Sequence, residues 1–312
     1  MRNWFVLSLL VCSTLALGQA SSSSAPQDLS SLNGRQEPPM LGIHWARGFD
    51  PFARSNEAHS GFAGGKRTPN MTYHGGKIMP TADSKIIFWG PSWGSYSGDE
   101  ITGMDSWYVG FSNSNYSKTS DEYTGTNGQV GAATSYGGHQ VDTTTASGGG
   151  STSAILAEVC KVITNPDTSG NGYYAVYVDI PRGNAGYCAY HSAGTCGGVP
   201  VQFAFFWKLD GDAGCDPQDT SGLHSEGLAA LSNVSGHELS EARSDPASPG
   251  AWYDSRGQEN GDKCAWTFNV PLVPFSNGTQ WKIQGEWSNA AFTNGTGYPN
   301  SSGQRAASTG TE

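Results

Sequence analysis

The chain has 312 residues, 43 of them glycine, and a formal net charge of −10 although only 14% of its residues are charged. An acidic chain of this kind repels nucleic-acid phosphates and anionic lipid headgroups, so we expect no nucleic-acid partner. Aromatic residues make up 11% of the chain and can still supply a hydrophobic core.

Residues 1–20 have the pattern of a secretory signal peptide. Arg2 is followed by an apolar run over residues 4–17 and by small residues where a peptidase can cut. A lipoprotein signal at Cys12 is the alternative, but the residues before this cysteine are not small. No later run approaches the ~20 apolar residues that span a bilayer. We therefore predict a secreted, extracellular protein without a membrane span.

Residues 21–69 are rich in Ser, Gly, Pro, Gln and Arg and contain few branched apolar residues. Such a composition buries too little surface to offset chain entropy, which predicts a flexible, propeptide-like arm. Within this arm the stretch GIHWARGF (42–49) can dock on the body. Residues 70–312 are expected to form a single globular domain with a Gly/Asn/Thr-rich C-terminal tail.

The globular part alternates between strand-like and helix-like segments. Short runs rich in β-branched and aromatic residues predict strands, and apolar residues at three- and four-residue steps predict helices. Capping residues and Asx-Pro pairs mark the helix ends. The strands are expected at 84–90, 173–180, 199–209 and 264–270, and the helices at 99–111, 151–164 and 222–244. This order predicts a loop-rich α/β or α+β domain with a mixed sheet and the polar cluster described below on its longest helix.

Five cysteines remain after the signal peptide, and in an oxidising compartment most should be paired. Cys188 and Cys196 bracket the polar segment AYHSAGT and are expected to close a short loop. Cys215 and Cys264 flank the longest helix and are expected to tie its ends together. Cys160 is then the buried odd thiol. Zinc binding by cysteine is not expected, because no Cys-x-x-Cys spacing occurs.

Two further patterns suggest surface interactions of an exported glycoprotein. Trp89, Trp93 and Tyr96 can stack on sugars, although aromatic residues at this spacing also suit a core. Asn-x-Ser/Thr sequons, which are candidate surface glycosylation sites, begin at Asn70, Asn115, Asn233, Asn277, Asn294 and Asn300.

The segment VSGHELSEARSDP (234–246) concentrates ionisable residues in a chain that has few. On a helix, His237 and Glu241 lie one turn apart on the same face, and Asp245 continues that line. Glu238, about 100° around the helix, points beside a metal held by this pair, where a carboxylate can take a proton from water. The zincin motif has histidine in place of Glu241, but a carboxylate is also a zinc ligand.

A catalytic zinc site requires three protein ligands and one open position. Downstream, Glu259 and Asp262 lie in a turn-rich segment, and Asp245 is a nearer rival for the third ligand. We therefore predict zinc held by His237, Glu241 and one of these carboxylates, with Glu238 as the general base. The spacing of the other histidines, notably His74, His191 and His224, does not recommend them as ligands.

Two alternatives require no catalysis. In the first, Glu241 pairs with Arg243 or caps a neighbour, Glu238 is a solvated helix residue, and His237 is a hydrogen-bonded core residue. In the second, an all-oxygen set holds a structural calcium ion. That set consists of Asp245, Asp254, Glu259 and Asp262.

Several sequence blocks together resemble the phosphate-induced protein 1 or EXORDIUM-like family and its microbial relatives. The blocks are TYHGG before SKIIFWG, then GHELSE followed by AWYD, GQENGD and a cysteine. The resemblance implies an extracellular protein associated with growth and cell expansion, without a settled biochemical activity. Several plant members lack the His-Glu pair, so the resemblance by itself implies no catalysis. The matching positions are Tyr73, His74, Gly75, Gly76, Gly236, His237, Glu238, Leu239, Glu241, Ala251, Trp252, Tyr253, Glu259, Gly261, Asp262 and Cys264.

These observations lead to one principal hypothesis and one main alternative. The principal hypothesis is a secreted, metal-dependent hydrolase, a zincin-like peptidase that acts on a peptide or cell-wall-associated substrate. The alternative is a non-enzymatic extracellular binding protein with structural calcium or no metal. A cell-wall carbohydrate binder that uses the tryptophans is a third possibility.

Overall fold

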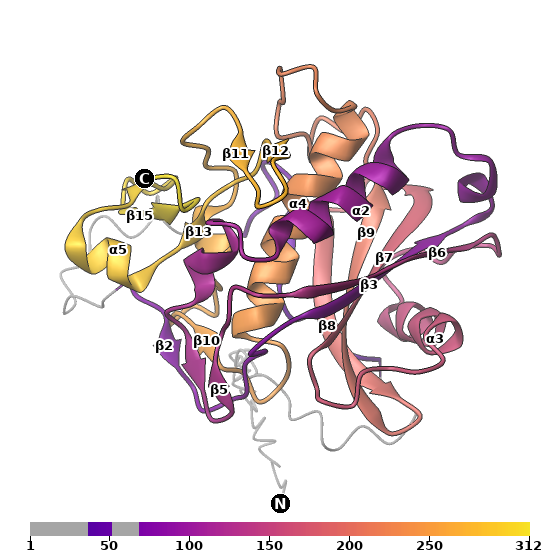
Figure 1. The fold of residues 1–312 in the computed structure, drawn as a ribbon, viewed down its shortest axis with the longest axis horizontal. Coiled ribbons are helices and arrows are strands. Elements are labelled where there is room, and N and C mark those ends of the chain that lie inside the picture. The colour runs from indigo at the N-terminus through magenta and orange to yellow at the C-terminus, as the bar shows by residue number, and fades with distance from the viewer. Residues whose placement is uncertain (1–36, 52–68) are drawn as a thin grey trace, which may run out of the picture.

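A six-stranded mixed sheet forms the centre of the molecule (Figure 1). The computed structural model describes residues 37–51 and 69–312. Strands β9, β7, β3 and β6 run parallel to one another, whereas β8 runs antiparallel to β9, and β1 antiparallel to β8. In spatial order the strands are β1 (Ile43–Trp45), β8 (Tyr187–Cys196), β9 (Val199–Lys208), β7 (Gly172–Pro181), β3 (Asp83–Trp89) and β6 (Ser135–Asp142).

Helices cover both faces of this sheet. Helices α2 (Glu100–Phe111) and α4 (Glu226–Ser244) lie on one side and α3 (Thr152–Val162) on the other, as Figure 1 shows. The remaining described elements are short: α5 (Asn289–Asn294), β2 (Thr72–Tyr73), β4 (Thr124–Gly125), β5 (Gly128–Gln129), β10 (Trp252–Tyr253), β11 (Val273–Pro274), β12 (Gln280–Trp281), β13 (Glu286–Trp287), β14 (Tyr298–Pro299), β15 (Arg305–Ser308), and the 3-10 turns η2 (Pro91–Ser95), η3 (Ser117–Ser120) and η4 (Asp262–Cys264).

Helix α4 is polar in sequence but buried along almost its whole length. Its start is fixed by Ser225, whose hydroxyl accepts a hydrogen bond of 3.1 Å from the Leu228 N–H. It packs on β8, β9, β1 and α2. Several of its polar side chains are paired inside the protein: Ser235 bonds the Tyr177 hydroxyl at 2.7 Å, and Asn233 accepts from the Gln284 N–H at 2.8 Å. The helix therefore places polar chemistry in the interior.

The structure confirms the expected α+β class with a mixed sheet, and most predicted elements match observed ones within a few residues. Three expectations are wrong. No strand occurs over 264–270, and the long helix begins at Glu226, so that Leu223 is exposed and does not extend its apolar stripe. The polar segment between Cys188 and Cys196 is strand β8, because pairing with β1 and β9 satisfies its backbone on both sides.

The disulfide pattern also differs from the expected one. Cys160 on α3 is bonded to Cys196, and Cys188 is bonded to Cys215, which leaves Cys264 as a buried free thiol. Because Cys188 and Cys196 stand at opposite ends of strand β8, they cannot close a loop together. Cys264 belongs to a separate apolar cluster with Trp287 and Tyr298.

Removing the bond between Cys188 and Cys215 should destabilise the domain. This bond ties β8 to the loop before α4 and closes a separation of 27 residues. A double serine variant is expected to lose about 2–4 kcal/mol of unfolding free energy in urea, mainly through the freer unfolded chain. A Cys264→Ser variant, which breaks no disulfide, is the control. Equal midpoints and slopes for the double variant and the wild type would contradict this expectation.

The structure describes only some of the predicted N-terminal segments and sequons. The predicted signal peptide, residues 1–20, lies outside the described residues. Of the expected flexible arm, residues 37–51 are described, and β1 from the GIHWARGF stretch lies on the sheet beside β8. Two of the sequon asparagines, Asn233 and Asn300, are buried and are not surface sites.

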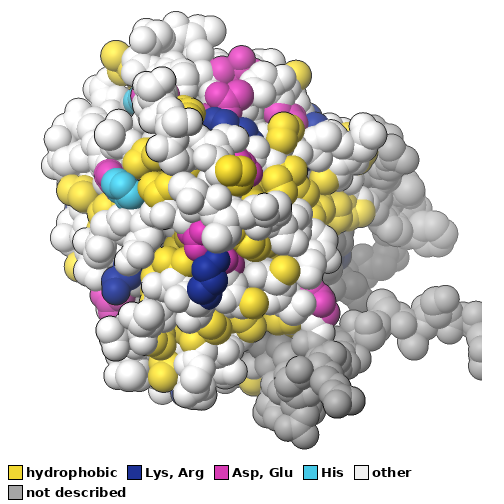
Figure 2. Space-filling view, turned by 90° about the vertical axis from the view of Figure 1, so that its right-hand side faces the viewer, with side chains coloured by type: hydrophobic (Ala, Val, Ile, Leu, Met, Phe, Trp, Pro, Cys, Tyr) yellow, Lys and Arg dark blue, Asp and Glu magenta, His cyan; other side chains and the backbone are white. Residues whose placement is uncertain are grey.

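Neither a membrane-spanning helix among the described residues nor a concentrated patch of basic charge on the face in Figure 2 stands out. Among the described residues, no helix is long and apolar enough to cross a bilayer. On the face in Figure 2, acidic and basic side chains are scattered among neutral and apolar ones. The face in that view offers no concentrated basic surface for a polyanion.

Candidate metal centre

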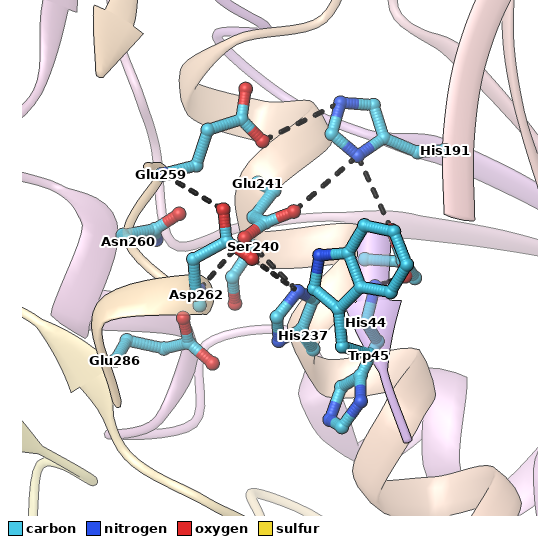
Figure 3. A network of polar contacts seen from close by, with 12 residues as sticks. His44, Trp45, His191, His237, Ser240, Glu241, Glu259, Asn260, Asp262 and Glu286 are labelled. Carbon is cyan, nitrogen blue, oxygen red and sulfur yellow. Dashed lines mark hydrogen bonds and ion pairs between the residues drawn. The ribbon is translucent and has the colours of Figure 1, made fainter. Parts of the chain in front are cut away.

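Two side chains one turn apart on α4 face each other inside the protein (Figure 3). His237 Nε2 lies 3.0 Å from Glu241 Oε1, and both side chains are fully buried. Despite this short distance the two atoms are not aligned for a hydrogen bond, and among the described residues His237 Nε2 has no hydrogen-bond partner. Two ligand atoms of a tetrahedral zinc ion, each ~2.0–2.1 Å from the metal, lie about 3.3 Å apart. The spacing of the pair therefore suits a shared cation.

His191 approaches the same carboxylate from strand β8. Its Nδ1 lies 3.3 Å from Glu238 Oε2 and 3.7 Å from Glu241 Oε2. Its Nε2 lies 3.3 Å from the Asp245 carbonyl oxygen and 3.8 Å from Glu259 Oε2. Two groups of side chains have candidate ligand atoms within 4.8 Å of one another: His191, Glu241 and Glu259, and His237, Glu238 and Glu241. Glu241 belongs to both groups.

Glu238, the predicted general base, is anchored on both carboxylate oxygens. Its Oε1 accepts a hydrogen bond of 3.1 Å from the backbone N–H of His44, and its Oε2 lies 3.3 Å from His191 Nδ1. Its carboxylate also lies within 4.8 Å of the candidate ligand atoms of His237 and Glu241. The side chain can therefore orient His191, join the ligands, or accept a proton beside them.

Three carboxylates are candidates for the third ligand, and the loop after α4 brings two of them, Glu259 and Asp262, to the cluster. Asp262 Oδ1 lies 3.8 Å from His237 Nε2, and the Asp262 N–H donates to Glu241 Oε1 at 2.9 Å. Glu259 faces His191 and keeps Oε2 without a hydrogen-bond partner. The carboxylate of Asp245 accepts from the Ala251 N–H at 2.6 Å, so that only its carbonyl oxygen faces His191.

His44 and Gln284 complete the cluster, and sequence reasoning missed both. The ring of His44 lies against that of His237 with centroids 4.3 Å apart. The Gln284 amide oxygen lies 3.1 Å from His44 Nε2, and its Nε2 lies 3.1 Å from His237 Nδ1 while donating to the Gly261 carbonyl. With this amide orientation, the proton of a neutral His237 is on Nε2. Cation binding at Nε2 would move that proton to Nδ1 and require the amide to turn.

Burial sets the protonation of these groups. It raises the pKa of Glu238, Glu259 and Asp262 well above the usual range, and the negative charge of Glu241 adds to this effect. Burial acts in the same direction on Glu241, but the neighbouring His237 outweighs it and lowers the pKa of that carboxyl. Burial also lowers the pKa of His191 to about 4. Glu241 is therefore the carboxylate that stays ionised most readily.

The segment from Leu41 to His44 packs against the cluster. The backbone of Leu41 donates to the His191 carbonyl at 2.9 Å, and the Gly42 carbonyl accepts from the His191 N–H at 3.1 Å. Asp262 is the cluster residue nearest to solvent, with 11% of its side chain exposed at a small pocket of about 40 Å³. A water molecule needs roughly 10–15 Å³, so this pocket admits water but no peptide.

Replacing Gly42 by alanine should disturb this covering segment. A Cβ atom there would lie 2.1 Å from Glu241 Oε2 and 2.3 Å from His191 Cε1, so that backbone or side chains must shift. We expect a loss of about 1–3 kcal/mol of unfolding free energy, as for other overpacked sites. Gly150→Ala, where a Cβ meets no atom within 4 Å, is the matched control. Equal stability of the two variants would show that β1 does not pack on the cluster in solution.

The structure separates the alternatives offered by the sequence. Arg243 donates to the carbonyl oxygens of Ser117 and Gly131 and does not pair with Glu241. Asp254 of the calcium set is bound by Lys263 at 2.9 Å and lies outside both ligand groups. The predicted sugar-stacking face is wrong, since Trp89 and Trp93 are buried in the core.

Two of the histidines whose spacing did not recommend them as ligands, His74 and His224, lie apart from the cluster. His74 stacks on Tyr253 and contacts the Thr72 hydroxyl at 3.0 Å. His224 stacks on Trp281 and lies 3.2 Å from Asp219. Both therefore have local partners away from α4, whereas His191, which sequence spacing did not recommend, joins the cluster.

The arrangement of buried imidazole and carboxylate groups can hold a divalent metal ion. Its ligand atoms come from α4, from β8 and from the loop that leads into η4, and partnerless atoms of His237, Glu241 and Glu259 lie in it. Comparison with protein-family models, curated proteins and solved structures finds no match for the chain. The function must therefore be inferred from the chemistry of these residues.

Proposed function

We propose that the protein is a secreted zinc-dependent hydrolase that cleaves peptide bonds. His237 and Glu241 would hold the metal, Asp262 would be the third ligand, and Glu238 would act as the general base. One observation carries the proposal. His237 Nε2, which makes no aligned hydrogen bond to a described residue, lies 3.0 Å from Glu241 Oε1, inside the protein and beside a second glutamate.

Each residue has a role that its position supports. Zinc would supply a Lewis acid that makes bound water acidic near neutral pH. Glu238 lies within 4.8 Å of both α4 ligands and can accept the proton of that water. Asp262, which stands at the small solvent pocket, marks the side from which water reaches the centre. We choose it over Glu259 as the third ligand because Asp262 lies 3.8 Å from His237, whereas Glu259 faces His191.

A peptide substrate needs more space than the pocket provides. Strand β1 lies over His191 and Glu238, so hydrolysis requires this segment to move away. Among the described strands, β1 is an edge strand of three residues that pairs only with β8. Such a short edge strand is held by few backbone hydrogen bonds and can separate without disrupting the remaining sheet. Export of the protein follows from the predicted signal peptide and agrees with two disulfides.

The second candidate is a non-enzymatic extracellular binding protein of the EXORDIUM-like kind. Two observations favour it: the cluster is almost wholly buried, and the Gln284 amide leaves the His237 proton on Nε2, toward Glu241. In this alternative the cluster organises α4 and its loop, either through hydrogen bonds alone or around a structural ion.

Metal analysis combined with a peptide-cleavage assay distinguishes these functions. Secreted protein is assayed before and after limited proteolysis that releases the segment ending at residue 51, then after chelation and after return of zinc or calcium. The hydrolase proposal expects bound zinc and cleavage that chelation abolishes and zinc restores. Calcium or no metal, with no cleavage in either form, would support the binding protein.

A further inference from the structure

Glu241 presents one carboxylate oxygen to each of two imidazoles. Oε1 lies 3.0 Å from His237 Nε2, and Oε2 lies 3.7 Å from His191 Nδ1. Oε2 has no hydrogen-bond partner although the side chain is fully buried. An ion at the His237 side uses one oxygen and leaves the other beside His191, within a group of ligand atoms from His191, Glu241 and Glu259 that lie within 4.8 Å of one another. A carboxylate in this position can bridge two cations.

The second set of donors surrounds one nitrogen of His191. A neutral imidazole carries a single N–H, but acceptor oxygens face both ring nitrogens of His191. If the proton is on Nδ1, it points at Glu238 Oε2, 3.3 Å away, and Nε2 presents a lone pair to two more oxygens. These are the Asp245 carbonyl at 3.3 Å and Glu259 Oε2 at 3.8 Å. These oxygens and Nε2 then face one another with lone pairs, which is unfavourable. A cation bound between them would remove this repulsion.

The same tautomer gives Glu238 an orienting role. Metal-bound histidines commonly donate their other ring N–H to a carboxylate, which fixes the ring. Glu238 is held for this purpose by the His44 backbone N–H at 3.1 Å. Glu259 is 5% exposed and keeps Oε2 partnerless, although it is a carboxylate in the interior.

The cluster gathers more acidic side chains than the three ligands of one zinc ion require. Four acidic side chains line it, namely Glu238, Glu241, Glu259 and Asp262. The basic side chains of the same segments are engaged elsewhere: Arg243 with backbone carbonyls and Lys263 with Asp254. Buried carboxylates without a counter-charge are costly, and cations are the usual solution.

We propose that the protein binds a second divalent cation between His191 Nε2, Glu259 and Glu241, so that Glu241 bridges two ions. This inference rests on the proposed metal ion at His237 and Glu241. The ligand set of one imidazole and carboxylate oxygens suits zinc or manganese. Paired ions about 3.5–4 Å apart are a known arrangement for hydrolysis, in which both ions stabilise the reacting oxygens.

Counting metal ions in full-length variants tests the proposal. Metal-free protein is loaded with Zn²⁺ or Co²⁺, freed of excess ion and analysed by elemental analysis, with circular dichroism to check folding. We expect two ions per chain in the wild type, one in Glu259→Gln and one in His237→Ala. Gln replaces Glu259 with a side chain of the same shape, and Glu226→Gln, on the exposed first turn of α4, should keep both ions.

A readout on the wild type guards against variants that fail to fold. Two bridged Co²⁺ ions couple magnetically, which removes most of the electron paramagnetic resonance signal expected for two isolated ions. A wild type that binds one ion with an uncoupled signal, and an equal count in Glu259→Gln, would overturn the second site and leave the proposed hydrolase intact. A wild type that binds one ion, with no ion in either Glu259→Gln or His237→Ala, would also overturn the second site. That result would indicate a single ion shared by both groups of ligands. No bound ion would overturn both proposals.

Discussion

Replacing Glu241 by glutamine is expected to remove the bound metal and to lower the melting temperature by about 10 °C. Glu241 contacts His237 and accepts a hydrogen bond of 2.9 Å from the Asp262 N–H, so its carboxylate joins α4 to the following loop. Breaking a buried charged contact typically costs about 3–5 kcal/mol. For a domain of this size each kcal/mol shifts the melting temperature by roughly 2–4 °C.

Thermal unfolding with and without a chelator measures this effect. Chelation of the wild type should lower its melting temperature toward that of Glu241→Gln, whereas the variant itself should not respond to chelation. Glu226→Gln, which changes an exposed carboxylate on the same helix, should stay close to the wild type and keep its response to the chelator. A Glu241→Gln variant with wild-type stability and metal content would contradict the assignment of Glu241 as a ligand.

Replacing Glu238 by glutamine should reduce peptide hydrolysis by about 10²–10⁴-fold, the usual contribution of a general base. Glutamine can still accept the His44 N–H at one oxygen, so the fold and the bound metal should be retained. The measurement is kcat beside metal content for the wild type, Glu238→Gln and the control Glu226→Gln.

The outcomes for Glu238 distinguish three roles. If Glu238→Gln loses activity but keeps the metal, the result supports Glu238 as the general base. Activity and metal lost together would make Glu238 a ligand, which its distance of less than 4.8 Å from the ligand atoms of His237 and Glu241 permits. Unchanged activity would remove Glu238 from the reaction and leave it as the residue that orients His191.

The α4 part of the site could be predicted because it depends on local geometry alone. A four-residue step on a helix places His237 and Glu241 on one face whatever the rest of the fold does. The return of Asp262 and Glu259 could also be anticipated, because a turn-rich segment shortly after a helix can fold back upon it. The sequence did not decide between the two carboxylates, and they face different histidines.

The histidines from the sheet side could not be predicted from spacing. His191 reaches the cluster because β8 lies in the sheet beneath α4, and the register that pairs His191 with Ala204 of β9 sets its position. AYHSAGT looked like a loop because it is polar, but His191 faces the polar helix α4, and the Ser192 hydroxyl donates to the Pro39 carbonyl. His44 comes from a segment whose composition predicted no fixed structure, and it is held by contacts with Glu238 and Gln284.

The disulfides illustrate the same limit. Spacing along the chain favoured the pairing of Cys188 with Cys196, but an extended strand separates them. Cys160 and Cys196 meet because α3 packs across β8, a contact between elements distant in sequence. Pairing therefore depends on the tertiary arrangement, which local patterns do not encode.

A crystal structure with diffraction data collected on both sides of the zinc absorption edge is the sharpest test of the proposed metal centre. We expect anomalous density in contact with His237 Nε2 and Glu241 Oε1, with the Gln284 amide oxygen turned toward His237 Nδ1. Well-ordered density without such a peak, in protein never exposed to a chelator and with His237 hydrogen-bonded directly to Glu241, would contradict the assignment of a metal to this pair.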